Sequence, residues 1–197
     1  MVKPLVLAST SRHRRALLER AGLSFVPCAP RCDEEIAEGT PPAEIVVVLA
    51  RRKAESLAPE HPDGLIIGSD QVVEIDGRVL GKPGTVEAAT AQLVSMSGRE
   101  HRLLTGLCVH EPSTGRSETG LSVHRMRMWP LDEERLARYV ARDLPLDCAG
   151  SYRVEAAGVT LFESMEGDDF TAIVGLPLCL LARLLLRFDV TLVDYLG

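Results

Sequence analysis

Hydroxyl and guanidinium side chains gather where the first apolar segment of this sequence ends. Ser9 and Ser11 follow the apolar run 4–8, and Arg14 and Arg15 fall in the first turn of a helix-like segment. A helix N-terminus exposes unpaired N–H groups and partial positive charge, so two cations there are locally unfavourable. Together these groups could form a cradle for a polyphosphate. The same spacing fits equally well an N-cap at Ser11 with both arginines facing solvent.

Carboxylates form a second set of candidates. Asp70 follows the apolar run 65–67 after two small residues, which places it at the carboxyl end of a buried strand, where open α/β sheets bind ligands. A carboxylate there could hold a divalent metal or accept a proton from water. Taken alone, a turn aspartate bonded to its own backbone is the commoner explanation. Glu34, in the acidic run 33–35, is a second candidate metal ligand, although such runs are more often solvated.

Two lysines could add positive charge to the same chemistry. Lys53 lies in the helix-like segment 42–58, and Lys82 lies in the turn 81–84 that closes a hairpin signal at 76–77. Each could reach a phosphate. The alternative is that Lys53 lies on a solvated helix face and Lys82 in an ordinary exposed turn. The five histidines are scattered without the spacing of a zinc site, and no nucleophile elbow occurs.

Alternating strands and helices must position these residues. Hydrophobic periodicity predicts helices over 14–22, 42–58, 86–96, 131–142 and 176–188, and strands over 4–8, 25–28, 65–67, 71–75, 78–80, 101–110, 117–128 and 159–163. The sequence contains no internal repeat and no linker, and a domain typically takes roughly 150 residues. We therefore predict a single α/β domain over residues 1–197, with a twisted mixed β-sheet that contains hairpins and is flanked by helices.

Composition excludes several classes of protein. The net charge of −6 argues against a partner as long as DNA or RNA, because such binders carry a basic face. Residues 1–60 are nearly neutral, however, so a few cations in this region could still bind the phosphates of a single nucleotide. The longest apolar runs, 45–50 and 173–182, are too short to span a membrane, and the N-terminus lacks a signal-peptide cleavage region. Five scattered cysteines fit a reducing compartment, so we expect a cytoplasmic protein.

Short motifs occur along most of the chain, from about residue 4 to residue 186. They are Ser9-Thr10-Ser11 with Arg14-Arg15, Asp33-Glu34, Lys53, Gly68-Ser69-Asp70, Gly81-Lys82-Pro83, Ser97-Gly98-Arg99, Thr105-Gly106, Ala149-Gly150-Ser151-Tyr152, Glu166-Gly167-Asp168 and Val174-Gly175-Leu176-Pro177-Leu178. In this order they resemble the Maf family of nucleotide pyrophosphatases. The resemblance implies a Maf/inosine triphosphatase-like fold. It also implies hydrolysis of a nucleoside triphosphate between its α and β phosphates, giving the monophosphate and pyrophosphate, with Mg²⁺ or Mn²⁺ as cofactor.

The resemblance also gives each candidate residue a role. Asp70 becomes the catalytic proton acceptor for the attacking water, and Glu34 and Asp70 become the metal ligands. The charged and hydroxyl groups that bind the triphosphate and stabilise the pyrophosphate leaving group are Ser9, Ser11, Arg14, Arg15, Lys53 and Lys82. Catalysis would then rest on electrostatic stabilisation and not on a covalent intermediate.

Two branches of the family differ at the residues that select the base. This chain has Gln71 after Asp70 and Glu155 after the Ala-Gly-Ser-Tyr segment, which resembles the 7-methyl-GTP branch and not the dTTP/UTP branch. A glutamate could accept hydrogen bonds from guanine N1–H and N2–H₂, and its charge suits a cationic methylated base. His13 stands where that branch often has an aromatic residue, and it can still stack on a base. Ala156 stands where glycine is usual.

Other functions compete with this hypothesis. A dTTP/UTP pyrophosphatase of the same family is one alternative, and a non-catalytic nucleotide-binding regulator of septum formation is another. The complete set of candidate cations and carboxylates argues against a pure binding protein, because binding alone needs no positioned base. A tRNA- or DNA-binding role conflicts with the charge balance and the 4% aromatic content. The resemblance further implies a homodimer.

Overall fold

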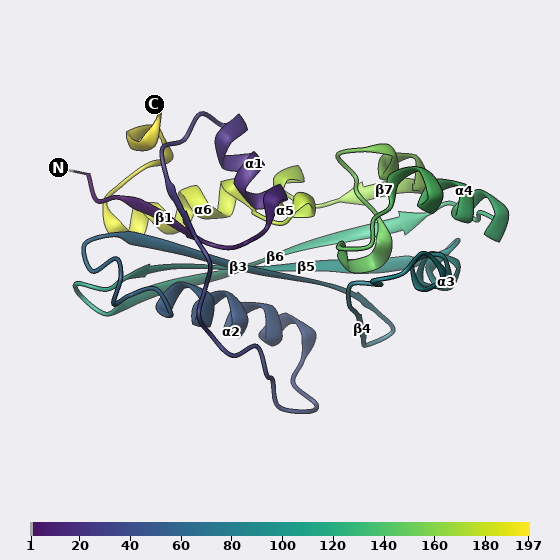
Figure 1. Ribbon diagram of the computed structural model, residues 1–197, viewed down its shortest axis with the longest axis horizontal. Coiled ribbons are helices and arrows are strands. Elements are labelled where there is room, and N and C mark those ends of the chain that lie inside the picture. Colours follow the sequence, from purple (N-terminus) through teal and green to yellow (C-terminus); the bar gives the residue numbers. More distant parts are fainter. Residues whose placement is uncertain (1) are drawn as a thin grey trace. The chain divides into compact units, whose positions relative to one another are not determined.

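The computed structural model describes residues 2–197 (Figure 1). Its helices and strands, in chain order, are β1 (Leu5–Ala8), α1 (Arg12–Arg20), β2 (Val26–Cys28), α2 (Pro42–Glu55), β3 (Leu65–Ile75), β4 (Arg78–Leu80), α3 (Val86–Met96), β5 (Glu100–Glu111), β6 (Arg116–Met128), α4 (Glu133–Asp143), β7 (Phe162–Glu166), α5 (Phe170–Val174) and α6 (Leu178–Leu185). The sheet has seven strands in the order β2-β1-β3-β5-β6-β7, and β4 pairs with β3. β1 runs parallel to β2 and β3, whereas β3–β4 and β6–β7 are antiparallel. The predicted α/β fold with a mixed sheet is confirmed.

By its contacts the chain divides into two compact units, which we describe separately. The first unit comprises residues 1–70, 105–122 and 169–197, and the second comprises residues 71–104 and 123–168. The long strands β3, β5 and β6 each contribute residues to both units. That residues 1–197 form a single domain stays a prediction.

The first unit buries both faces of its strands. Figure 1 shows α2 on one side of the sheet and α1 and α6 on the other. On the α2 side the buried residues are Val6, Ala8, Ala50, Ala54, Leu57, Ile66 and Cys108. On the other side they include Leu5, Leu7, Leu17, Leu18, Leu65, Ile67, Leu107, Leu181, Leu184 and Leu185. Because successive strand side chains point to opposite faces, the continuous apolar runs of β1 and β3 are those expected of strands covered on both sides.

Two glycines allow α2 to approach the sheet closely. A Cβ at Gly68 in β3 would overlap the Ala50 carbonyl of α2, and a Cβ at Gly106 in β5 would overlap the Val46 carbonyl. Any other residue at either position would push the helix away from the strands. The close approach holds the C-terminal half of α2 against β3.

In the second unit, an aromatic cluster forms part of the core. His101 on β5 is buried against Tyr152 and Phe162, with ring centroids 5.7 and 5.9 Å away, and its Nε2 lies 3.0 Å from the Tyr152 hydroxyl. Burial lowers the pKa of His101 to about 4, so the ring is neutral at physiological pH. The cluster fixes the start of the segment that leads to Glu155.

Several predicted elements differ in extent from the structure. The strand predicted over 65–67 is part of one continuous strand to Ile75, so Asp70 lies within β3 and not after it. The strand predicted over 159–163 begins only at Phe162, because residues 157–161 form a 3₁₀ helix. The helix predicted over 176–188 begins at Leu178, since Gly175 adopts a left-handed conformation (φ +118°) and ends α5 just before it.

Within residues 2–197, no helix combines the length and the apolar composition needed to cross a bilayer.

Candidate functional site

The junction between β1 and α1 brings hydroxyls and a guanidinium together, as the sequence predicts. Ser11 is the N-cap of α1, and its Oγ accepts a hydrogen bond from the Arg14 amide. The Ser9 hydroxyl oxygen accepts from the Ser11 amide at 3.1 Å and lies 3.4 Å from Nη1 of Arg14. The N-cap interpretation is therefore confirmed for Ser11. It does not exclude the phosphate cradle, because Ser9 and Arg14 meet at the same helix end.

A backbone carbonyl from a distant segment fixes the Arg14 side chain. Nε of Arg14 donates to the Gly175 oxygen at 2.8 Å, and the buried Ser69 hydroxyl donates to the same oxygen at 3.0 Å. Burial lowers the pKa of Arg14 from its usual value, whereas the negative charges of Asp70 and Glu34 oppose that shift. Arg14 thus stays a cation held in one orientation.

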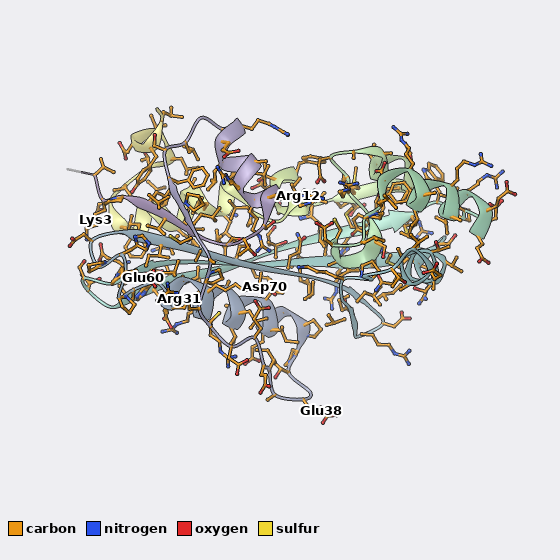
Figure 2. The ribbon with its side chains drawn as sticks, viewed as in Figure 1. Lys3, Arg12, Arg31, Glu38, Glu60 and Asp70 are labelled. Atoms are coloured by element: carbon orange, nitrogen blue, oxygen red, sulfur yellow. The ribbon has the colours of Figure 1, made fainter. Side chains whose placement is uncertain are left out.

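Lys53 lies between two carboxylates in the first unit. Its side chain is only 9% exposed, and Nζ lies 2.6 Å from Oδ1 of Asp70 and 3.1 Å from Oε1 of Glu34. Asp70 lies two residues beyond Gly68, the last residue of β3 that pairs with β1. The site therefore lies where β1 has ended and β3 continues, and Figure 2 labels Asp70 on this strand beside α2.

The carboxylate pair has the chemistry of a divalent-cation site. Oxygens of Asp70 and Glu34 both face one ammonium nitrogen, so the two carboxylates already converge on a positive charge. Carboxylate oxygens are the ligands that Mg²⁺ and Mn²⁺ prefer. Glu34 is 60% exposed, so its side chain can rearrange toward an incoming ion, whereas Asp70 is held by β3. These residues fit the predicted metal.

The structure does not bring Arg15 to this cluster. Its Nε lies 2.7 Å from the Glu19 carboxylate one turn along α1, and its side chain is 58% exposed. Such an exposed pair contributes little to stability. His13 lies in the first turn of α1, where its Nε2 accepts from Nε of Arg12 at 3.3 Å.

Three of the predicted residues belong to the second unit. Gln71 follows Asp70 directly on β3, the exposed Lys82 follows β4, and the exposed Glu155 lies in a loop before the 3₁₀ helix 157–161. Their roles in base selection and phosphate binding stay predictions.

Sequence reasoning missed the contribution of the segment 169–179. The Asp169 carboxylate accepts from the amide and hydroxyl of Thr171 and, at 2.7 Å, from the Cys179 amide, which ties α5 to the start of α6. That tie fixes the turn at Gly175 whose carbonyl holds Arg14. The only signal in the sequence is the motif 174–178, because a carbonyl acceptor leaves no trace in residue type.

Comparison with known proteins places this chain in a family. The family model for "Maf-like protein" matches residues 4–188. The chain is 44% identical to a 7-methyl-GTP pyrophosphatase of Syntrophotalea carbinolica, over 100% of this chain and 94% of the relative. It is 46% identical to the protein of that name from Pseudomonas putida, over 93% and 96%, and 45% identical to that from Pseudomonas aeruginosa, over 93% and 95%. Because the family model covers nearly the whole chain and the relatives match over nearly their full length, the chain belongs to the Maf family.

Proposed function

We propose that this chain is a nucleoside triphosphate pyrophosphatase that hydrolyses 7-methyl-GTP between its α and β phosphates. The names of the curated relatives support the reaction and the substrate. The observation that carries the proposal is the placement of Lys53 between Asp70 and Glu34, in the unit that also holds Arg14 at the β1–α1 junction. A site that only binds nucleotides needs cations, but it does not need two converging carboxylates.

Asp70 acts as the proton acceptor. Lys53 binds its Oδ1, which orients the carboxylate and assigns the second oxygen, Oδ2, to the attacking water. The water loses a proton to Asp70 as its oxygen forms a bond to the α phosphorus. The bond from that phosphorus to the oxygen that bridges the α and β phosphates breaks, and pyrophosphate leaves with the bridging oxygen. A base fixed on a sheet strand keeps its geometry during this step better than one on a mobile loop.

Glu34 and Asp70 would hold the Mg²⁺ or Mn²⁺ ion. When bound, such an ion polarises phosphoryl oxygens and neutralises negative charge that develops on the leaving group.

Arg14 and the serines at the β1–α1 junction bind the triphosphate. The Gly175 carbonyl accepts from Nε of Arg14, which leaves the terminal guanidinium nitrogens, beside the Ser9 hydroxyl, to donate to phosphate oxygens. Lys53 is the second cation that the first unit offers to the triphosphate. Lys82 and Arg15 are proposed to neutralise further negative charge on the phosphates. Arg15 must leave Glu19 to do so, a small loss because that pair is exposed.

The base is read by residues that differ between branches of the family. Glu155 accepts hydrogen bonds from N1–H and N2–H₂ of guanine, and its negative charge favours the positive charge of the 7-methylated ring. Gln71 provides an adjustable donor and acceptor, and His13 stacks on the base. We propose a cytoplasmic location because the protein's five cysteines are free thiols, as a reducing compartment maintains them.

Product analysis with a single isosteric variant tests the reaction. Incubation of the protein with 7-methyl-GTP and Mg²⁺ or Mn²⁺ is expected to release the monophosphate and pyrophosphate in equal amounts. Asp70→Asn should lower kcat by at least about 100-fold, the usual contribution of a general base, while nucleotide binding persists. Asp63→Asn, an exposed substitution just before the start of β3, is the control and should leave kcat unchanged.

Three outcomes would contradict parts of this proposal. Release of inorganic phosphate and a diphosphate would overturn the bond assignment. Equal activity of wild-type protein and Asp70→Asn would overturn the role of Asp70. Nucleotide binding without turnover under either metal would favour the regulator.

A further inference from the structure

The segment that carries Glu155 is anchored on both sides of that residue. In the second unit, the Ser151 hydroxyl donates to Gln92 Oε1 of α3 at 2.6 Å, and the Tyr152 hydroxyl lies 3.0 Å from His101 Nε2 on β5. Val154 is buried, whereas Glu155 is exposed. The chain therefore presents one acidic side chain from an otherwise fixed backbone.

The C-terminal half of α4 holds the backbone on both sides of Glu155. The Arg153 amide donates to the Tyr139 hydroxyl at 3.0 Å, and the Ala157 amide donates to Oδ2 of Asp143 at 3.0 Å. Both acceptors are buried, and they lie four residues apart on one face of the helix. Glu155 lies midway between the two anchored amides.

The position of Asp143 in its helix indicates that this contact has a purpose beyond helix formation. Asp143 is the last residue of α4, where a carboxylate opposes the negative end of the helix dipole. Burial adds a desolvation cost to this unfavourable position. The hydrogen bond from the Ala157 amide offsets part of that cost, so the carboxylate stabilises the loop at the expense of the helix.

The loop itself leaves little conformational freedom between the two anchors. The Arg153 carbonyl accepts from the amides of Ala156 at 3.1 Å and Gly158 at 2.9 Å, so the chain closes a tight turn around that oxygen. A Cβ at Gly158 would overlap the backbone of Arg153. The turn therefore needs glycine at its far end, and Glu155 projects from its tip.

We propose that Tyr139 and Asp143 are positioning residues that set the base selectivity of the enzyme by holding the Glu155 loop. This inference rests on the proposed function, in which Glu155 accepts hydrogen bonds from the edge of a cationic guanine. Two parallel hydrogen bonds to one carboxylate depend strongly on its orientation. A loop freed at one anchor still offers charge, but it loses the alignment that separates 7-methylguanine from other bases.

The test is the ratio of dissociation constants for GMP and 7-methyl-GMP, measured by isothermal titration calorimetry. Monophosphate binding requires no hydrolysis, so the readout is independent of catalysis. Tyr139→Phe and Asp143→Ala each remove the side-chain oxygen that accepts from the loop, and each is expected to lower the ratio about fivefold, the effect of losing one hydrogen bond. In steady-state assays both variants should raise KM for 7-methyl-GTP and leave kcat within about twofold of wild type.

Two controls separate positioning from general destabilisation. Tyr195→Phe removes a buried hydroxyl that makes no hydrogen bond among the described residues, and it should leave the ratio unchanged. Asp132→Ala removes the N-cap of α4 without touching the loop, so it should lower the melting temperature but not the ratio.

Each result decides the inference and the proposed function separately. An unchanged ratio in Tyr139→Phe and Asp143→Ala overturns the inference even if wild-type protein hydrolyses 7-methyl-GTP. A wild-type protein that binds GMP and 7-methyl-GMP equally also overturns it, since there is then no selectivity to set. A ratio that falls in both variants supports the inference even if no hydrolysis occurs, in which case only the proposed reaction fails.

Discussion

Removing the Lys53 ammonium should destabilise the protein through the carboxylate that it leaves behind. The Lys53 and Asp70 side chains are 9% and 13% exposed and lie 2.6 Å apart, so the pair is largely desolvated. Loss of one partner of a buried pair typically costs about 3–5 kcal/mol, because the remaining charge is uncompensated. For Lys53→Met, which keeps the apolar stem, we expect a loss of about 3 kcal/mol, since Asp70 retains some contact with water.

Urea unfolding in EDTA and in Mg²⁺ measures this effect. In EDTA the variant should show the full loss, whereas saturating Mg²⁺ should recover much of it, since a ligand at 100 times its Kd adds about 2.7 kcal/mol. Wild-type protein should gain less from Mg²⁺, because its ammonium already neutralises both carboxylates. Arg51→Met is the matched control on the same helix. Its exposed pair with Glu55 should contribute only about 0.3–0.5 kcal/mol.

Two results would refute this reasoning. A loss in EDTA no larger than that of Arg51→Met would show that Asp70 does not depend on the ammonium. An equal response of wild type and Lys53→Met to Mg²⁺ would show that the ion does not use the space between the carboxylates.

Three further predictions concern pH, packing and phosphate binding. The pKa of His101 is about 4 in the folded protein and 6.5 in the free side chain. As the pH falls, the unfolded chain therefore takes up a proton on His101 before the folded protein does. The free energy of unfolding should fall by up to about 3 kcal/mol between pH 6.5 and pH 4. In urea unfolding at pH 7.5 and 4.5, His101→Gln should lose much of this pH dependence, and an unchanged slope would contradict it. Gly106→Ala forces a Cβ into the Val46 carbonyl and should cost at least about 3 kcal/mol in thermal unfolding, whereas Gly81→Ala meets no atom within 4 Å and should be nearly neutral. Arg14→Gln should lower kcat/KM for the triphosphate about 10- to 100-fold, as expected for a lost charge-assisted hydrogen bond, and a change below twofold would remove Arg14 from the site.

Local sequence patterns predicted that hydroxyls and a guanidinium meet at the β1–α1 junction, because the residues involved are close in the chain. Ser9, Ser11 and Arg14 fall within six positions, so strand and helix periodicity alone brings them together. The pairing of Asp70 with Lys53 could not be predicted from neighbouring residues, because it depends on how closely α2 packs on β3. The signal for that packing is Gly68, which only a structure identifies as a point of contact with the helix.

Sequence reasoning failed where long-range backbone contacts override local preference. The 3₁₀ helix 157–161 has the composition of a strand start, yet the Asp143 carboxylate and the Arg153 carbonyl capture its first amides. Asp70 looked like a turn residue because of the two small residues before it. Strand β3 nevertheless continues past it, and antiparallel pairing with β4 begins at Val73. Neighbouring residues in the sequence predict neither the acceptors that bind the 3₁₀ helix nor the strand that pairs with the second half of β3.

A comparison of kcat/KM between substrates tests the central claim most directly. The measurement is kcat/KM for 7-methyl-GTP, GTP, dTTP and UTP with the wild-type protein and saturating Mg²⁺ or Mn²⁺, followed by pyrophosphate release. The account predicts that 7-methyl-GTP has the highest value and that dTTP and UTP are poor substrates. Turnover of dTTP or UTP as fast as, or faster than, that of 7-methyl-GTP would contradict it.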